Sequence, residues 1–133
     1  MRLLLDTHVL LWALGAPHRL PATLATALCD PENEVLFSAV NIWEIAIKAG
    51  QGRPTFDNDA ALVAREARAA GFVDLPVTAQ HAAAAQGLPA LHGDPFDRLL
   101  VAQALCEPLH LVTADRQIAR YAAPVRHFSP NPS

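Results

Sequence analysis

The chain has 133 residues, a formal net charge of −3 and 52% hydrophobic residues, a size that suits one domain with a well-buried core. No apolar stretch reaches the roughly 18 residues of a membrane span, and Asp6 interrupts the one N-terminal run that resembles a signal peptide. These features argue against a membrane protein and predict a cytoplasmic one.

Short apolar runs alternate with helix-like segments along the chain, and Gly or Pro bounds most of them. Strands are predicted at 2–5, 35–37, 72–75, 109–112 and 125–128. Helices are predicted at 7–14, 21–29, 40–48, 57–70, 79–86 and 95–106, with a short one that ends near residue 121. Strands that alternate with helices imply a parallel sheet with right-handed crossovers.

Three local features add to this outline. The segment 40–48 is apolar nearly all round, which predicts a buried helix. Arg53 and Pro54 begin a loop, and the Pro-rich segment 129–133 is predicted to be a loose tail. No repeat or linker divides the chain, so we expect one domain over residues 1–133.

Four carboxylates, Asp6, Glu44, Asp97 and Asp115, lie beside or within apolar sequence, where an unpaired charge is costly. Asp6 and Asp115 follow predicted strands, at the sheet edge where open α/β sheets bind ligands. Glu44 lies on the apolar helix, and Asp97 shares a helix face with apolar residues three, four and seven positions later.

Each acid also has a purely structural interpretation. The two acids that follow strands can cap the helices behind them, and Glu44 can pair with Lys48. Asp97 comes three residues after Asp94, an ordinary arrangement at a helix start. If the four acids converge, however, they repel one another unless a cation joins them, and oxygen ligands suit Mg²⁺ or Mn²⁺. Spacing alone leaves both interpretations open.

No competing site is evident in the sequence. The two cysteines and six histidines show no zinc-binding spacing, and there is no Gly-rich phosphate loop. Removing the four acids from the net charge of −3 leaves +1, so the charge does not exclude a polyanionic substrate.

Four sequence blocks in this order and spacing are similar to those of a known family; they lie at 4–12, 38–48, 92–104 and 111–115. The chain resembles PIN-domain proteins and, among them, VapC-type toxins of bacterial toxin–antitoxin pairs. The resemblance implies a three-layer α/β/α sandwich with a central, mainly parallel sheet. It also implies endoribonuclease activity that depends on Mg²⁺, with Mn²⁺ as a substitute, and that leaves 5′-phosphate and 3′-hydroxyl ends.

The resemblance also assigns roles to residues and implies partners. The family's four metal-binding catalytic acids correspond to Asp6, Glu44, Asp97 and Asp115, and its small hydroxyl residue corresponds to Thr113. The implied partners are an RNA substrate, a cognate VapB-type antitoxin and a second copy of the chain in a homodimer.

Several assignments stay open. Arg98 and Arg116 each follow a site acid and are candidates for contacts with RNA phosphates; pairing with surface acids is the alternative, and Arg98 can also hold the acids together without metal. Asp94 is either a helix cap or a further metal contact. Trp12 and Trp43 belong either to the core or to a partner surface.

Two other functions remain in competition: a PIN-fold module that binds RNA or a partner without efficient catalysis, and a metal-dependent DNA nuclease. A phospho-accepting receiver domain fits poorly, because Lys48 is the only lysine and lies far from the C-terminus. Which RNA is the target is not indicated, since specificity lies in loops and surface shape.

Overall fold

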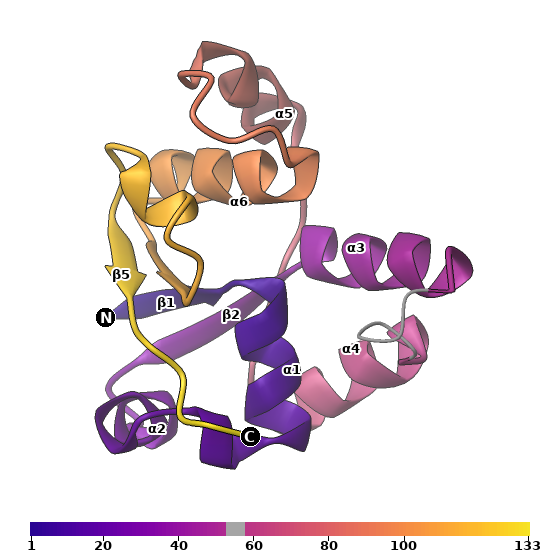
Figure 1. The fold of residues 1–133 in the computed structure, drawn as a ribbon, viewed down its shortest axis with the longest axis vertical. Helices are drawn as coiled ribbons and strands as arrows, with labels where there is room; N and C mark the ends of the chain where they lie inside the picture. Colours follow the sequence, from indigo (N-terminus) through magenta and orange to yellow (C-terminus); the bar gives the residue numbers. More distant parts are fainter. Residues whose placement is uncertain (53–57) are drawn as a thin grey trace.

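The computed structural model describes residues 1–52 and 58–133. Five strands form one sheet in the order β3-β2-β1-β4-β5, and every pairing is parallel (Figure 1). The strands are β1 (Arg2–Leu5), β2 (Glu34–Ser38), β3 (Val73–Leu75), β4 (His110–Thr113) and β5 (Val125–His127). This confirms the predicted parallel sheet.

Helices connect the strands close to the predicted positions. They are α1 (Thr7–Gly15), α2 (Ala22–Cys29), α3 (Ala39–Gly50), α4 (Ala60–Ala69), α5 (Ala79–Ala84) and α6 (Pro95–Cys106), with short 3₁₀ helices η1 (Pro17–Arg19), η3 (Ala85–Gly87) and η4 (Ile118–Arg120). The helix start predicted at residue 57 and the loop predicted at 53–54 lie outside the described residues. None of the described helices has the length and apolar character needed to cross a bilayer.

The sheet separates two apolar cores, which gives the predicted three-layer sandwich. Leu4 pairs in register with Leu36 on one side and Leu111 on the other, and these side chains pack in one cluster with α6. The alternate positions, such as Leu5 and Phe37, face the opposite cluster with α1, α2 and α4. In Figure 1, α5 and α6 lie above the strands while α1 and α2 lie below them.

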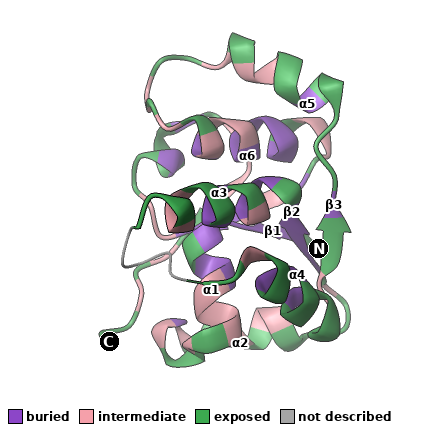
Figure 2. Ribbon diagram, turned by 90° about the vertical axis from the view of Figure 1, so that its right-hand side faces the viewer, coloured by how far each residue is buried: buried purple, intermediate pink, exposed green. Residues whose placement is uncertain are grey.

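Helix α3 is only half-buried, so the prediction of a buried helix is wrong. Its buried face carries Val40, Asn41, Glu44 and Ile45, and the same helix also has exposed positions (Figure 2). Trp43 on this helix is 54% exposed. The Trp43 ring meets the ring of the α6 residue Phe96 in a T-shaped arrangement, at 5.1 Å between centroids. Trp12 is partly buried against the core, so neither tryptophan is a fully buried core residue. Apolar composition does not reveal which face of a helix finds a partner.

The C-terminal tail also differs from the prediction of a loose segment. The Asn131 backbone N–H donates to Arg19 O at 2.8 Å, and Arg19 Nε donates to Asn131 O at 2.7 Å. The Asn131 amide donates to two more carbonyls around η1. Phe128 meets the Trp12 ring edge-on at 6.3 Å. These contacts hold the tail against the end of α1.

Candidate metal centre

The two acids that follow strands meet where the sheet connections reverse direction. β1 and β4 are neighbours in the centre of the sheet, although their sequence positions are far apart. Leu5 pairs in register with Val112, and Asp6 N donates to Val112 O at 3.0 Å. The carboxyl ends of β1 and β4 therefore place Asp6 and Asp115 at the topological switch point, where α/β sheets bind ligands.

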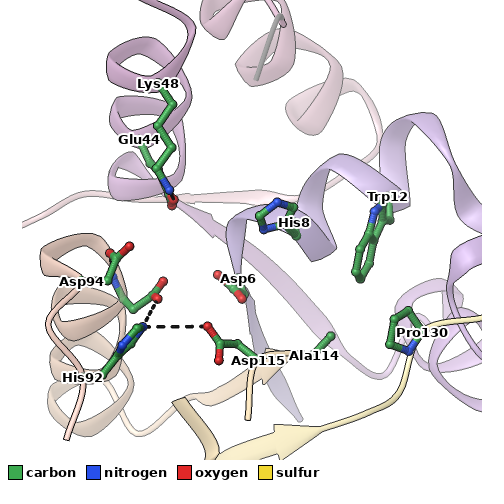
Figure 3. A pocket seen from close by; sticks show the side chains of 11 residues that line it. Asp6, His8, Trp12, Glu44, Lys48, His92, Asp94, Ala114, Asp115 and Pro130 are labelled. Carbon is green, nitrogen blue, oxygen red and sulfur yellow. Dashed lines mark hydrogen bonds and ion pairs between the residues drawn. The ribbon is translucent and has the colours of Figure 1, made fainter. Parts of the chain in front are cut away.

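Two helix segments bring the other acids to the same edge. Ser38 caps α3 through a capping box with Asn41, and Asp94 caps α6 by accepting from Asp97 N at 3.0 Å. The resulting pocket of about 460 Å³ is shown in Figure 3. It is lined by five carboxylates, Asp6, Glu44, Asp94, Asp97 and Asp115, together with His8, Trp12, Lys48, His92, Ala114 and Pro130. All four acids predicted as metal ligands lie in this pocket.

Asp6 is buried, and both of its carboxylate oxygens accept hydrogen bonds from the protein. Its Oδ1 accepts from Thr7 N at 2.7 Å and its Oδ2 accepts from Thr113 Oγ1 at 2.8 Å. Burial raises the pKa of the Asp6 carboxyl above its usual range, and these two hydrogen bonds oppose the rise. Thr113 Oγ1 also accepts from Asp115 N at 2.9 Å. Since Thr113 is fully buried, it orients two acids from behind the pocket.

Thr7 holds Glu44, and Asn41 in turn holds Thr7; neither residue was predicted as part of the site. Thr7 Oγ1 donates to Glu44 Oε1 at 2.6 Å, and Asn41 Nδ2 donates to Thr7 Oγ1 at 3.0 Å. Lys48 forms an ion pair with Glu44 Oε2, which is the pairing considered as the structural alternative. A signal for Asn41 was present: it lies three residues before Glu44, on the same face of an otherwise apolar helix.

The environment of Asp97 also disfavours its ionised form. Burial, followed by the nearby charges of Asp6 and Asp94, raises the pKa of the Asp97 carboxyl to about 7. A hydrogen bond between His92 Nε2 and Asp97 Oδ2, at 2.7 Å, acts in the opposite direction. His92 Nε2 also lies 3.8 Å from Asp115 Oδ2. His92 was not assigned to the site from the sequence, although it stands just before the Asp94 cap.

This donor set fits a hard divalent cation. Carboxylate oxygens are the ligands that Mg²⁺ and Mn²⁺ prefer, and His92, Asp94 and Asp97 place possible ligand atoms within 4.8 Å of one another. Burial and mutual repulsion disfavour the ionised form of Asp6 and Asp97, whereas a positive charge nearby favours the ionised form and so opposes both effects. The helix-cap role of Asp94 is shown, and a metal contact from its other oxygen remains a prediction.

Arg98, one of the two arginines predicted to contact RNA phosphates, is bound to groups of the protein itself. Its guanidinium donates to Pro89 O and Ala85 O at 2.9 Å each, and it contacts Tyr121. Arg98 thereby ties the segment before α6 to that helix, and none of these partners lines the acidic pocket. Arg116 is exposed, so its contact with RNA phosphates stays a prediction.

Replacing Arg98 by methionine should lower the free energy of unfolding by about 1–3 kcal/mol, because several carbonyls lose a charged donor. The salt dependence of RNA binding should not change, since the guanidinium is directed to the protein's own backbone. Urea unfolding and a salt titration of RNA affinity measure the two effects. If Arg98→Met weakens the salt dependence of RNA binding and leaves the free energy of unfolding unchanged, this assignment is wrong and Arg98 contacts an RNA phosphate.

Comparison with known proteins gives the family. The PIN domain profile matches residues 3–124. Ribonuclease VapC22 of Mycobacterium tuberculosis (strain ATCC 25618 / H37Rv) is 33% identical over 127 residues, which cover 91% of this chain and 92% of that protein. The residues matched by the PIN domain profile, 3–124, include all five pocket acids.

Two solved structures share the fold at low sequence identity. VapBC2 from Rickettsia felis, bound to a DNA fragment from its promoter, has a TM-score of 0.69 at 13% identity and covers 97% of this chain and 100% of that chain. DNA-bound VapBC from Salmonella typhimurium has a TM-score of 0.68 at 14% identity and covers 96% of this chain and 98% of that chain. The chain therefore belongs to the PIN domain family, among its VapC-type proteins.

Proposed function

We propose that residues 1–133 form a single PIN domain that acts in the cytoplasm as the toxin of a type II toxin–antitoxin pair. Its activity is divalent-metal-dependent endonucleolytic hydrolysis of RNA phosphodiester bonds. The observation that carries this proposal is the convergence of four acids, from the ends of β1 and β4 and from α3 and α6, in one open pocket. Similarity to Ribonuclease VapC22 supports RNA as the substrate.

Asp6, Glu44, Asp97 and Asp115 are the residues that would hold Mg²⁺, for which Mn²⁺ can substitute. When bound, a divalent cation supplies Lewis acidity toward the phosphate and a water of lowered pKa as nucleophile. The chain itself supplies the positioning of the carboxylates. Thr113 fixes Asp6, and its Oγ1 also fixes the backbone of Asp115.

Two further features of the chain suit this chemistry. Asp97 Oδ2 and His92 Nε2 are 2.7 Å apart, so the pair can hold a proton beside the pocket. The pocket is partly open to solvent, and Ala114 and Pro130 line it on the side away from Glu44 (Figure 3). An RNA strand can therefore approach the acids without a change in the fold.

The test is cleavage of end-labelled transfer and ribosomal RNA by purified, antitoxin-free protein with Mg²⁺, Mn²⁺ or EDTA, beside the Asp6→Ala variant. We expect discrete cuts with 5′-phosphate ends that both EDTA and the substitution abolish, and no cuts in DNA of the same sequence. Cleavage that persists in EDTA contradicts the proposal. Equal cleavage of DNA favours the DNA nuclease, and RNA binding without cleavage favours the binding module.

We also propose a VapB-type antitoxin and a second copy of the chain as partners. The structural relatives are VapBC assemblies, which supports the antitoxin. The exposed Trp43 and Ile47 on α3 offer apolar area for such contacts. Light scattering of the purified protein, alone and with a co-expressed antitoxin, measures both associations.

A further inference from the structure

Lys48 is the only lysine of the chain, and its side chain extends into the acid-lined pocket (Figure 3). Its Nζ forms an ion pair with Glu44 Oε2, and the side chain is 13% exposed. Nζ also lies 5.6 Å from the centre of the Phe96 ring. The Lys48 ammonium group therefore contacts the carboxylate of Glu44, a proposed metal ligand.

The two oxygens of Glu44 have partners of different mobility. Oε1 accepts from Thr7 Oγ1, a buried hydroxyl that Asn41 fixes in turn. Oε2 is paired with Lys48, whose charge sits at the end of a flexible four-carbon stem with rotatable donors. Lys48 is therefore the partner that can leave Glu44 without disturbing the buried hydrogen bonds.

A divalent cation on Glu44 would compete with the ammonium for the same carboxylate. Two positive charges a few ångströms apart repel strongly in a partly buried site. The same cation brings an RNA phosphate to a pocket with five carboxylates, where a further positive charge favours the complex. Arg98, which follows Asp97 in the sequence, already donates to backbone carbonyls, so it does not supply this positive charge.

We propose that Lys48 exchanges partners. It is the counter-ion of Glu44 before metal binds, and it contacts a phosphate of the RNA beside the cleaved bond once a divalent cation occupies the acids. This inference rests on the proposed ribonuclease function and assigns the phosphate-binding cation of that site.

The first test measures the affinity for a short fluorescent single-stranded RNA in Ca²⁺, at several salt concentrations, with a gel to show that the RNA stays intact. Lys48→Gln should weaken binding about 3- to 10-fold and lower the slope of log Kd against log salt by about 0.7, the value for one phosphate contact on a single strand. Lys48→Arg should keep the slope. Arg65→Gln, an exposed cation on α4 outside the pocket, serves as the matched control.

The second test needs no substitution, because a protein labelled with ¹³Cε-lysine has a single lysine signal. Mg²⁺ without RNA should shift this signal, while K⁺ at the same ionic strength should not. RNA added in Ca²⁺ should shift it again. A signal that stays in place while calorimetry shows metal binding overturns the partner exchange.

The outcomes separate this inference from the proposed function. If wild-type protein neither binds nor cleaves RNA with any divalent ion, the proposed function fails. If wild-type protein binds and cleaves RNA while Lys48→Gln keeps the wild-type salt slope, only the assignment of Lys48 is overturned. Thermal unfolding of Lys48→Gln shows whether the variant is folded, and the spectrum of the wild type decides the question if it is not.

Discussion

Replacing Asp97 by asparagine should abolish RNA cleavage and, in EDTA at pH 8, make the protein more stable than the wild type. Asp97 is 8% exposed, and burial together with Asp6 and Asp94 raises its pKa from 3.8 to about 7. At pH 8 the metal-free wild type must therefore keep a buried charge next to other acids. Asparagine has the same shape without the charge, and its carbonyl still accepts from His92.

The expected loss of activity has a different cause, because Asp97→Asn removes a proposed ligand of the divalent cation. Even residues that only orient metal ligands contribute about 10- to 100-fold to metal affinity or activity, so loss of a ligand should cost at least about 100-fold. Cleavage rates at saturating Mg²⁺ measure this effect. The same carboxylate thus destabilises the metal-free fold and enables the reaction.

The pH dependence follows from the direction of the shift. A carboxyl with a raised pKa in the folded state stabilises the fold fully below pH 4, and this stabilisation is lost as the pH rises through 7. In EDTA, the gain from Asp97→Asn should accordingly be smaller at pH 5, where folded Asp97 is still protonated, than at pH 8, where it is ionised. Its upper limit is a few kcal/mol, since each pKa unit corresponds to about 1.4 kcal/mol.

Urea unfolding at both pH values measures this gain, with Asp115→Asn as the matched control. The Asp115 side chain is 37% exposed, so this variant should lose activity and gain little stability. Adding Mg²⁺ should stabilise the wild type by mass action and reverse the order of wild type and Asp97→Asn. A variant that is less stable than wild type in EDTA at pH 8 contradicts the argument.

The three central strands could be predicted from the sequence because each contains a short apolar run that is followed by a polar residue. Alternation along such a run places Leu4 and Leu5 in different cores, so only the register had to come from the structure. The exposure of α3 and the docking of the tail could not be predicted. Both depend on which surfaces remain uncovered after the chain has folded.

Asp6 and Asp115 could be located from the sequence because a carboxylate just after a buried strand is unusual. Thr7 could not be located in this way, because its role depends on Glu44, 37 positions away. Thr113 was indicated by the family resemblance, but its contact with Asp6, 107 positions away, comes only from the structure. For Arg98, the sequence suggested a place in the site that the structure does not support. It adjoins Asp97 in sequence, but consecutive residues of a helix point in different directions, so Arg98 faces the 85–89 segment while Asp97 faces the pocket.

Thr7 links two acids of the site through its backbone N–H and its hydroxyl. Its backbone N–H donates to Asp6 Oδ1, and its Oγ1 donates to Glu44 Oε1 while accepting from Asn41 Nδ2. Thr7 is 1% exposed, so water cannot replace a lost hydroxyl. The Asn41 amide also donates to Leu5 O at 3.1 Å, which ties the start of α3 to the end of β1.

Thr7→Val should therefore weaken Mn²⁺ binding about 10- to 100-fold, the range for residues that orient metal ligands. Valine fills the same space but leaves Glu44 Oε1 without its donor and one Asn41 proton without its acceptor. The unfolding free energy in EDTA should fall by about 1–3 kcal/mol for the same reason. Calorimetric titration of the folded protein with Mn²⁺ and urea unfolding measure the two effects separately.

Thr7→Ser is the decisive control, because it keeps the hydroxyl and removes only a methyl group. If the hydroxyl positions Glu44, serine should restore most of the metal affinity even where the lost methyl reduces stability. If the hydroxyl only stabilises the fold, Thr7→Val should bind Mn²⁺ like the wild type once it is folded. Affinity that follows the unfolding free energy of both variants, and not the presence of the hydroxyl, would contradict a positioning role for Thr7.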